Sequence, residues 1–348
     1  MPPWPKIDLP VRPPFAPMEA KLAARLPEGA QWRYEPKWDG FRVLVFRDGD
    51  GVVLQSKAGL PLGRYFPELE EATGRLPLDR FVLDGEIVVP TDGGFSFDDL
   101  LLRVHPAESR VRKLAAELPA AVVLFDALVL DGKALLATPQ DERRAALEAA
   151  AARADLAGPE GPGTFRLCAT TTELDQARRW LEAPGAADTD GVIAKRRDLD
   201  YRAGERDGMQ KVKRMRSADC VVGGFRYASK GGLVGSLLLG LHDDEGLLHH
   251  VGFCSTMPRK DKPELTRRLE GLRRPPGFTG HAPGGPSRWA TERSTEWEPL
   301  DPVLVVEVRY DHWSGGRFRH GTKFLRWRPD KAPRQCTFEQ VERPAPPA

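Results

Sequence analysis

The chain has 348 residues, of which 41% are hydrophobic and 29% are charged, and its formal net charge is +2 at pH 7. This length predicts two domains rather than one small core, and the composition is ordinary for a globular protein in water. Because the sequence has no apolar run near the roughly 20 residues that span a bilayer, and no secretory signal, we expect a cytoplasmic protein that does not bind membranes.

The first part of the chain predicts a mixture of strands and helices. Residues 1–17 are rich in proline and favour an extended segment over the surface. Short apolar or alternating runs bounded by turn residues predict strands, and alanine-rich or amphipathic stretches predict helices. We expect strands at residues 32–36, 42–47, 52–56, 81–89, 120–130, 191–195 and 209–214, and helices at residues 19–25, 141–153 and 173–183.

The pattern changes after Arg216, where short strands predominate. We expect strands at residues 220–225, 235–242, 247–253 and 303–310, one helix at 262–271 and a loop rich in Gly and Pro at 274–286. Several short strands and one helix in about 130 residues fit a small barrel of the OB type. We therefore expect a first domain of residues 1–216 and a second of residues 217–348.

Charge and cysteine patterns narrow the class of protein only slightly. Residues 195–216 contain nine Lys or Arg against four Asp or Glu, and residues 309–334 contain eight against two. Two basic stretches in a nearly neutral chain fit a surface for phosphates, but two solvated surfaces explain them as well. The four cysteines are far apart and have no CxxC pair, so we expect no disulfide framework, no zinc site and a reducing compartment.

The most informative short pattern is Lys37-Trp38-Asp39-Gly40-Phe41-Arg42, which directly follows an expected strand. A lysine attacks phosphorus only when its amine is neutral, and a neighbouring cation or metal favours that form. Gly40 permits a tight turn that presents the lysine at the end of the strand. On these residues alone a surface turn is an equally good interpretation, since a short motif is only a hypothesis.

The pattern resembles motif I of the covalent nucleotidyltransferases, a group that contains DNA ligases, RNA ligases and mRNA capping enzymes. Further motifs of that group follow in the expected order, which makes coincidence a poor explanation. They are Ser56-Lys57-Ala58-Gly59 (motif Ia), Asp84-Gly85-Glu86 (III), Phe125-Asp126 (IIIa), Asp190 to Lys195 (IV), Lys211-Val212-Lys213 (V) and Arg326 to Lys331 (VI). The likeness covers about residues 9–333 and is greatest to the compact bacterial ligase C group and to the ligase domain of ligase D.

This resemblance implies an α+β protein with an adenylation (nucleotidyltransferase) domain of antiparallel sheets and flanking helices, followed by an OB-fold β-barrel. It implies an ATP-dependent DNA ligase that seals 5′-phosphate/3′-hydroxyl nicks through lysyl-AMP and DNA-adenylate intermediates. Its cofactors would be ATP and Mg²⁺ or Mn²⁺. It would act as a monomer on nicked duplex DNA near the nucleoid, in DNA repair and recombination, with Ku or a repair polymerase/primase as possible partners.

The resemblance also implies a role for each matching residue. Lys37 would be the nucleophile, Glu35 and Phe125 would recognise the adenine, and Glu86 would bind the ribose and help to hold the metal. Asp190 would bind the metal, because Mg²⁺ prefers hard oxygen ligands. The remaining residues would contact AMP, DNA or pyrophosphate phosphates, where cations stabilise spreading negative charge: Arg42, Lys57, Lys195, Lys211, Lys213, Arg328, Asp330 and Lys331.

Taken singly, most of these residues have an ordinary structural explanation. Phe125 fits the core of an apolar strand, Glu86 fits a satisfied carboxylate at a strand end, and Lys211 and Lys213 fit the solvated face of an edge strand. Their joint order favours the functional interpretation. Two rival classes remain at this stage, an RNA ligase or capping guanylyltransferase and a nucleic-acid-binding module without catalysis.

The sequence departs from the family pattern at three positions. Lys57 stands where arginine is usual, which keeps the charge but loses the bidentate geometry. Asp190 stands where glutamate is usual, and Met209 stands where tryptophan often precedes motif V. These departures bear on metal geometry and efficiency rather than on the class of reaction.

Overall fold

The structure is a computed structural model and describes residues 4–92, 94–159, 161–182, 189–284 and 296–342. The chain divides into two compact units, Met1–Lys213 (unit 1) and Arg214–Ala348 (unit 2), and each is described by itself. The boundary expected between residues 216 and 217 lies slightly later, inside the first strand of unit 2. No helix in the described ranges is long and apolar enough to cross a membrane.

Unit 1 contains a large sheet that holds most of its apolar core. Its strand order is β10-β8-β5-β3-β4, with β9 beside β8, and only the β8–β10 pair is parallel. Its strands consist mainly of Val, Leu, Ile and Phe, which suit a pleated surface covered by helices. They are β3 (Phe41–Asp48), β4 (Gly51–Ser56), β5 (Arg80–Val88), β8 (Ala121–Leu130), β9 (Lys133–Ala134) and β10 (Phe165–Leu167).

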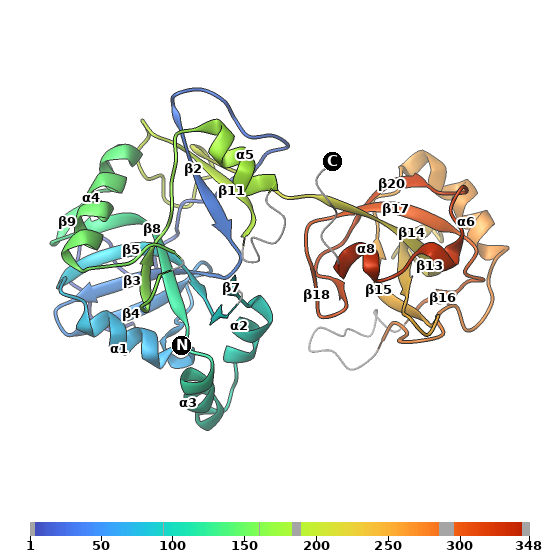
Figure 1. The fold of residues 1–348 in the computed structure, drawn as a ribbon, viewed down its shortest axis with the longest axis horizontal. Coiled ribbons are helices and arrows are strands. Elements are labelled where there is room, and N and C mark those ends of the chain that lie inside the picture. Colours follow the sequence, from blue (N-terminus) through green and yellow to red (C-terminus); the bar gives the residue numbers. More distant parts are fainter. Residues whose placement is uncertain (1–3, 93, 160, 183–188, 285–295, 343–348) are drawn as a thin grey trace. The chain divides into compact units, whose positions relative to one another are not determined.

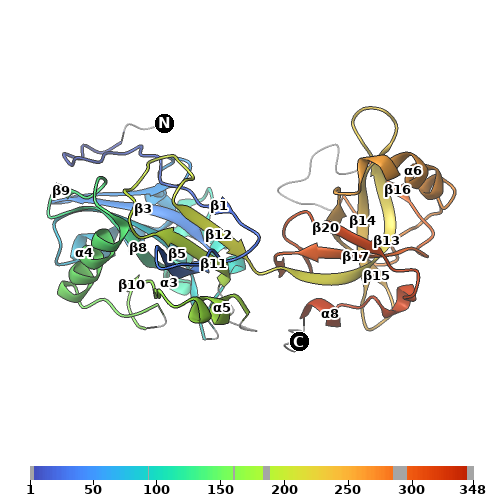
Figure 2. The ribbon, with the colours of Figure 1, turned by 90° about the horizontal axis from the view of Figure 1, so that it is seen from above.

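A small sheet forms the second layer of strands in unit 1. Its order is β1-β12-β11-β2, from β1 (Lys21–Leu22), β12 (Met209–Lys213), β11 (Thr189–Arg196) and β2 (Trp32–Trp38). Figure 2 shows β12 beside β11. A separate two-stranded ribbon consists of β6 (Pro90–Thr91) and β7 (Gly94–Phe95). The chain passes from the small sheet to the large sheet at Asp39-Gly40, between β2 and β3, so motif I joins the two sheets.

Helices cover the outer faces of these sheets because each buries one apolar face. Helix α4 packs on β8, α1 packs on β4 and β3, and α5 packs on β2 and β11 (Figure 1). The helices are α1 (Pro67–Arg75), α2 (Phe97–Arg103), α3 (Glu108–Glu117), α4 (Gln140–Arg153) and α5 (Leu174–Glu182), with a 3-10 turn η1 (Gly63–Tyr65).

Unit 2 is an OB-like antiparallel barrel around one core. Its main path is β15-β14-β13-β17-β20, with β16 beside β13, and α6 packs against β14 (Figure 2). Its strands are β13 (Arg216–Tyr227), β14 (Val234–His242), β15 (Leu248–Cys254), β16 (Glu298–Pro299), β17 (Val305–Tyr310), β18 (Trp313–Ser314), β19 (Arg317–Phe318) and β20 (Lys323–Trp327). Its helical segments are η2 (Arg259–Asp261), α6 (Lys262–Glu270), η3 (Pro333–Gln335) and α8 (Glu339–Glu342).

The expected α+β class is confirmed, but some elements differ from expectation. The helix expected at residues 19–25 is wrong, because Lys21 and Leu22 form strand β1 along β12 instead. The backbone N–H of Ala23 continues this pairing by donating to the Lys211 carbonyl at 3.0 Å. Helices α1, α2 and α3 lie where no element was expected.

All four cysteines are free thiols buried in the two cores. Cys168 belongs to unit 1, and Cys220, Cys254 and Cys336 belong to unit 2. Burial raises the pKa of the Cys168 and Cys336 thiols to about 12 and raises the pKa of Cys220 well above its usual value.

Candidate active site

A pocket of about 190 Å³ opens between the two sheets of unit 1. The small sheet and the segment that precedes it supply one wall, and the strands β3, β5 and β8 of the large sheet supply the other. The pocket gathers eight of the residues that the sequence assigned to a site, seven of them from six separate motifs and one, Glu35, from two positions before motif I. They are Glu35, Lys37, Arg42, Lys57, Glu86, Phe125, Lys195 and Lys211.

Strand alternation places the nucleophile candidate in this pocket. Trp32 and Tyr34 of β2 are buried against α5, so Glu35 and Lys37 point to the opposite face. Lys37 is paired in register with Gly191 of β11. A side chain at Gly191 would place its Cβ 2.0 Å from the Val212 carbonyl oxygen, so the close approach of β12 requires glycine there.

A β-bulge brings Asp190 to Lys37. The register between β11 and β2 shifts between Thr189 and Gly191, which leaves Asp190 as the extra residue, and such bulges re-aim side chains. The Asp190 carboxylate is 2.5 Å from Lys37 Nζ and 3.5 Å from Lys213 Nζ, and its side chain is only 8% exposed. Asp190 therefore lies beside the pocket next to Lys37, and Lys213 lies next to Asp190.

The lysines of this region influence one another. Burial lowers the pKa of Lys211, and the nearby charges of Lys37, Lys57 and Lys213 lower it further. Several cations around one partly buried space favour a polyanion there, because a bound phosphate relieves their mutual repulsion. The opposite interpretation, that Lys211 lies on a solvated edge, does not fit, because β1 covers that edge of β12.

Glu86 of β5 carries a partly buried carboxyl group at the turn of motif I. Its Oε1 accepts a hydrogen bond of 3.2 Å from the Gly40 backbone N–H. Burial raises the pKa of Glu86 to about 7, although the charges of Lys37 and Arg42 oppose the shift. A Cβ at Gly40 would lie 2.1 Å from the Ile87 carbonyl oxygen, so the turn can approach β5 only with glycine.

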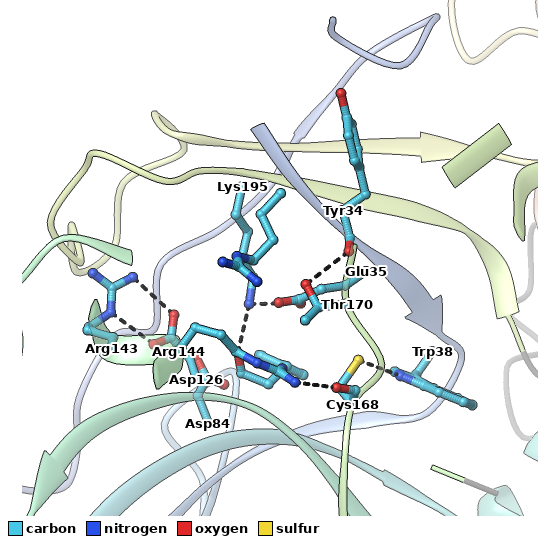
Figure 3. Close-up of polar contacts among 12 residues, drawn as sticks. Tyr34, Glu35, Trp38, Asp84, Asp126, Arg143, Arg144, Cys168, Thr170 and Lys195 are labelled. Carbon is cyan, nitrogen blue, oxygen red and sulfur yellow. Dashed lines mark hydrogen bonds and ion pairs between the residues drawn. The ribbon is translucent and has the colours of Figure 1, made fainter. Parts of the chain in front are cut away.

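Glu35, Lys195 and Phe125 form the other end of the pocket, and Figure 3 shows the Lys195 side chain pointing to Glu35. Lys195 Nζ is 2.8 Å from Glu35 Oε2 and donates to the Phe125 carbonyl oxygen at 3.0 Å, and both charged side chains are 3% exposed. Glu35 Oε1 is buried and has no hydrogen-bond partner. Lys195, expected at a phosphate, is thus held among the residues expected at the adenine.

The Phe125 ring lies between two cations. Lys195 Nζ is 4.7 Å and the Arg42 guanidinium carbon 5.5 Å from its centroid. Phe125 is the one residue of β8 that is not fully buried. A ring that faces a pocket from an otherwise buried strand fits a stacking surface better than an ordinary core residue.

Arg42 is held by a buried network rather than left open to phosphates. Its guanidinium donates to both Asp84 oxygens, at 3.0 and 2.7 Å. Although burial disfavours the guanidinium charge, the Asp84 carboxylate raises the pKa of Arg42. The Tyr201 hydroxyl donates to Asp84 Oδ2 at 2.7 Å and accepts from the Met18 backbone N–H at 3.0 Å, which ties the N-terminal segment to this network.

Lys57 has a partner that the sequence did not suggest. Its Nζ is 3.1 Å from Glu19 Oε2, and Arg206 binds the same oxygen at 3.1 Å. These cations lower the pKa of Glu19. Glu19 and Tyr201 are both missed by sequence reasoning. Neither belongs to a motif, and Glu19 lies in the segment expected as a helix.

The remaining expected residues lie in unit 2. Arg328 Nη1 donates to both oxygens of Asp219 at 2.9 Å, and Lys331 Nζ is 2.8 Å from Asp219 Oδ2. Arg328 Nε also donates to Asp330 at 3.0 Å. The sequence did not single out Asp219, the carboxylate that both cations share.

The two basic stretches are largely compensated by ion pairs in the structure. Many of their charges have carboxylate partners close in sequence or across a sheet, so the local charge excess is smaller than the sequence suggested. These pairs include Lys195–Glu35, Arg196–Asp198, Arg197–Asp141, Arg202–Asp200, Lys213–Asp190, Arg326–Glu307 and Arg328–Asp219.

The matches to known families divide the chain in the same way as units 1 and 2. Residues 17–213 match the family described as ATP dependent DNA ligase domain, and residues 230–331 match the ATP dependent DNA ligase C terminal region. DNA ligase C1 of Mycolicibacterium smegmatis is 46% identical, over 97% of this chain and 97% of that protein. The multifunctional non-homologous end joining DNA repair protein LigD of Mycobacterium tuberculosis is 32% identical, over 90% of this chain and 38% of that protein.

A solved structure of a Lig E DNA ligase shares the fold. It is 17% identical with a TM-score of 0.55, and the match covers 89% of this chain and 99% of that chain. The ordered motifs, the pocket that gathers them and these matches agree on one assignment.

Proposed function

The chain belongs to the family of ATP-dependent DNA ligases, and from this premise we propose that Lys37 is the residue that carries AMP. The observation that carries this proposal is the meeting of Lys37, Glu35, Glu86 and Phe125 in one pocket. Membership of this family also decides against the guanylyltransferase, the RNA ligase and the non-catalytic binding module.

The proposed chemistry has three displacements at phosphorus. Lys37 Nζ attacks the α-phosphorus of ATP, loses a proton, and the bond to the bridging oxygen breaks, releasing pyrophosphate. A 5′-phosphate oxygen of the nick then attacks the lysyl-AMP phosphorus and breaks the P–N bond. Finally the 3′-hydroxyl attacks the 5′-phosphate, loses its proton and expels AMP. Each step depends mainly on positioning and charge.

Asp190 suits the first step because its carboxylate lies 2.5 Å from Lys37 Nζ and fixes the position of this amine in the pocket. Lys211 and Lys213 are proposed to bind the phosphates, supported by the lowered pKa of Lys211 and the place of Lys213 beside Asp190. Arg328, Asp330 and Lys331 are proposed to orient the departing pyrophosphate, as the family likeness of motif VI implies.

At the base end, Glu35 is proposed to recognise adenine with Phe125 as the stacking surface. Its unpaired buried Oε1 is an acceptor that an exocyclic amine would satisfy, whereas the carbonyl oxygen of guanine would repel it. Lys195 holds the other oxygen of Glu35. Incubation with labelled ATP or GTP, followed by a chase with nicked DNA or RNA duplexes, tests this assignment. Labelling by GTP alone would contradict it.

The residues present fit a divalent cation, and we propose Mg²⁺ or Mn²⁺ held by Glu86 and Asp190. Among the described residues no group of three or more His, Cys, Asp or Glu side chains could hold a metal by itself. Mg²⁺ needs only one or two carboxylates when nucleotide phosphates and water complete its shell. When bound, it would neutralise charge on the phosphate oxygens.

The pathway and partners follow by analogy with relatives. We propose action on nicked duplex DNA near the nucleoid, in end joining or excision repair, because the relative LigD is described as a non-homologous end joining DNA repair protein. A Ku protein or a repair polymerase/primase is the proposed partner, and the chain is proposed to act as a monomer with the expected division into an adenylation domain and an OB-fold domain.

Replacing Glu86 with glutamine should raise stability at neutral pH while stopping adenylation. The folded pKa of about 7 lies above the unfolded value near 4.5, so the fold disfavours the charged form. The free-energy cost of ionising Glu86 in the folded protein is absent below about pH 4.5 and complete above about pH 7. Glu86→Gln should therefore gain stability relative to the native protein by about 3 kcal/mol between those limits. Urea unfolding at pH 4.5 and pH 8 measures this difference, and an equal effect at both pH values would contradict the burial of the charge.

Binding to nicked DNA should weaken steeply with salt if the exposed cations of the two basic stretches contact phosphates. Contact with about six phosphates lowers affinity about 1,000-fold between roughly 50 and 200 mM salt. Replacing the exposed residues Arg317 and Lys323 with neutral residues should make the affinity for DNA fall less steeply with salt. Arg75→Ala, on an exposed helix pair with Glu71, serves as the control. An affinity that is flat with salt would exclude these stretches as the binding surface.

A further inference from the structure

Two carboxylates stand side by side on the barrel of unit 2. Asp219 of β13 and Glu307 of β17 are directly opposite in antiparallel register, and their side chains are 10% and 17% exposed. Like charges in such positions destabilise a sheet. Packing of the barrel does not explain why two carboxylates lie side by side. We therefore attribute the pair to the cations that it binds.

Those cations come from β20 and the segment that follows it. Arg326 Nε lies 2.6 Å from Glu307 Oε2. Asp219 instead binds the other two cations of motif VI: Arg328 Nη1 donates to both of its oxygens, and Lys331 Nζ donates to Oδ2. Asp330, the other partner of Arg328, is 61% exposed. Asp219 is therefore the least exposed carboxylate of the cluster, and its position sets the positions of Arg328 and Lys331.

The backbone of Asp219 is itself fixed. Gln340 of α8 accepts from the Asp219 N–H at 3.0 Å and donates to the Asp219 carbonyl oxygen at 3.1 Å. A carboxylate anchored in this way can hold two long, flexible side chains in one arrangement. Prior ordering of charged groups is what makes them effective toward a developing charge.

We propose that Asp219 is a positioning residue for transfer of AMP to Lys37, which holds Arg328 and Lys331 in the orientation that receives the pyrophosphate. This inference rests on the proposed role of motif VI. Pyrophosphate leaves only in the first step, so Asp219 serves that step alone. Sealing of a nick that already carries AMP does not involve pyrophosphate and does not need this orientation.

The test measures two rates in Asp219→Asn: formation of the enzyme–AMP adduct across ATP concentrations, and sealing of a pre-adenylated nick. We expect adduct formation to slow about 10- to 100-fold, as for misplaced charged groups, and sealing of the pre-adenylated nick to stay unchanged. Glu298→Gln is the matched control, because it removes a partly buried carboxylate of the same barrel that pairs with Arg273 and with none of the described cations of motif VI. It should change neither rate by more than about twofold.

Unchanged adduct formation in Asp219→Asn would overturn the proposal, and so would an equal loss in both steps, which would indicate a purely structural role. Arg328→Ala separates this failure from failure of the proposed function: if it too leaves adduct formation intact, motif VI does not act in that step. Should Asp219→Asn not fold, Gln340→Ala releases the Asp219 backbone and keeps its charge. Slower adduct formation alone would then support the proposal, and unchanged rates would overturn it.

Discussion

Lys37→Ala is expected to form no enzyme–AMP adduct and to seal no nick with ATP. The side chain supplies the attacking nitrogen, and no other lysine of the pocket lies on β2 beside Asp190 with the same geometry. Losing a nucleophile removes the covalent intermediate itself, so the expected loss is at least about 10⁴-fold. Labelled ATP followed by denaturing electrophoresis measures the adduct directly.

Two comparisons make this result specific. Lys37→Arg keeps a cation beside Asp190 but lacks the lysine amine that attacks phosphorus. It should therefore also fail to form the enzyme–AMP adduct. Both variants should retain sealing of a pre-adenylated nick, because the 3′-hydroxyl is the nucleophile there. A labelled adduct of normal yield in Lys37→Ala would sink the assignment of the nucleophile.

Asp126→Ala is expected to lower the free energy of unfolding by about 3–5 kcal/mol. Arg143 of α4 donates to both Asp126 oxygens, at 2.9 and 3.1 Å, and both side chains are only 2% exposed (Figure 3). Truncation leaves the Arg143 charge buried without its partner. Asp126 belongs to the Phe-Asp pair of motif IIIa, so this prediction assigns the aspartate to folding and the phenylalanine to the nucleotide.

Denaturant unfolding with the double variant Asp126→Leu, Arg143→Met tests this explanation. Replacing both partners removes the unpaired charge and should recover most of the lost stability. Burial opposes the charged form of Asp126, but the Arg143 charge outweighs it and lowers the pKa of Asp126. The stabilisation is therefore present above the unfolded pKa near 4 and is lost as the pH falls below it. A double variant no more stable than Asp126→Ala would contradict the pairing argument.

Resemblance to a known family identified eight residues of the pocket, because its motifs contain the side chains that the chemistry requires. Lys37, Glu86 and Phe125 were identified from that resemblance, and so was the α+β class. Their partners were not identifiable. Tyr201 meets Asp84 across 117 positions, and Asp219 meets Arg328 across 109, and nothing local marks such contacts.

Lys195 and residues 19–25 show what the sequence left out. Lys195 lies in the pocket, but its partners Glu35 and the Phe125 carbonyl come from other strands, and no local pattern marks them. Residues 19–25 have helical propensity, but pairing with β12 overrides it. Helices α1 to α3 have only seven to ten residues each, and they are held by contacts such as Arg103 with Glu68, where the arginine is fully buried.

The buried cysteines have a practical consequence for measuring the distance between the two units. Thiol reagents attack the thiolate, and burial with raised pKa values suppresses that form at Cys168, Cys220 and Cys336. Cys254 is sealed in the same core. A cysteine introduced on the surface of each unit would thus accept a fluorophore without removal of the native thiols. Energy transfer between two such dyes would report the distance between the two units in each state of the enzyme.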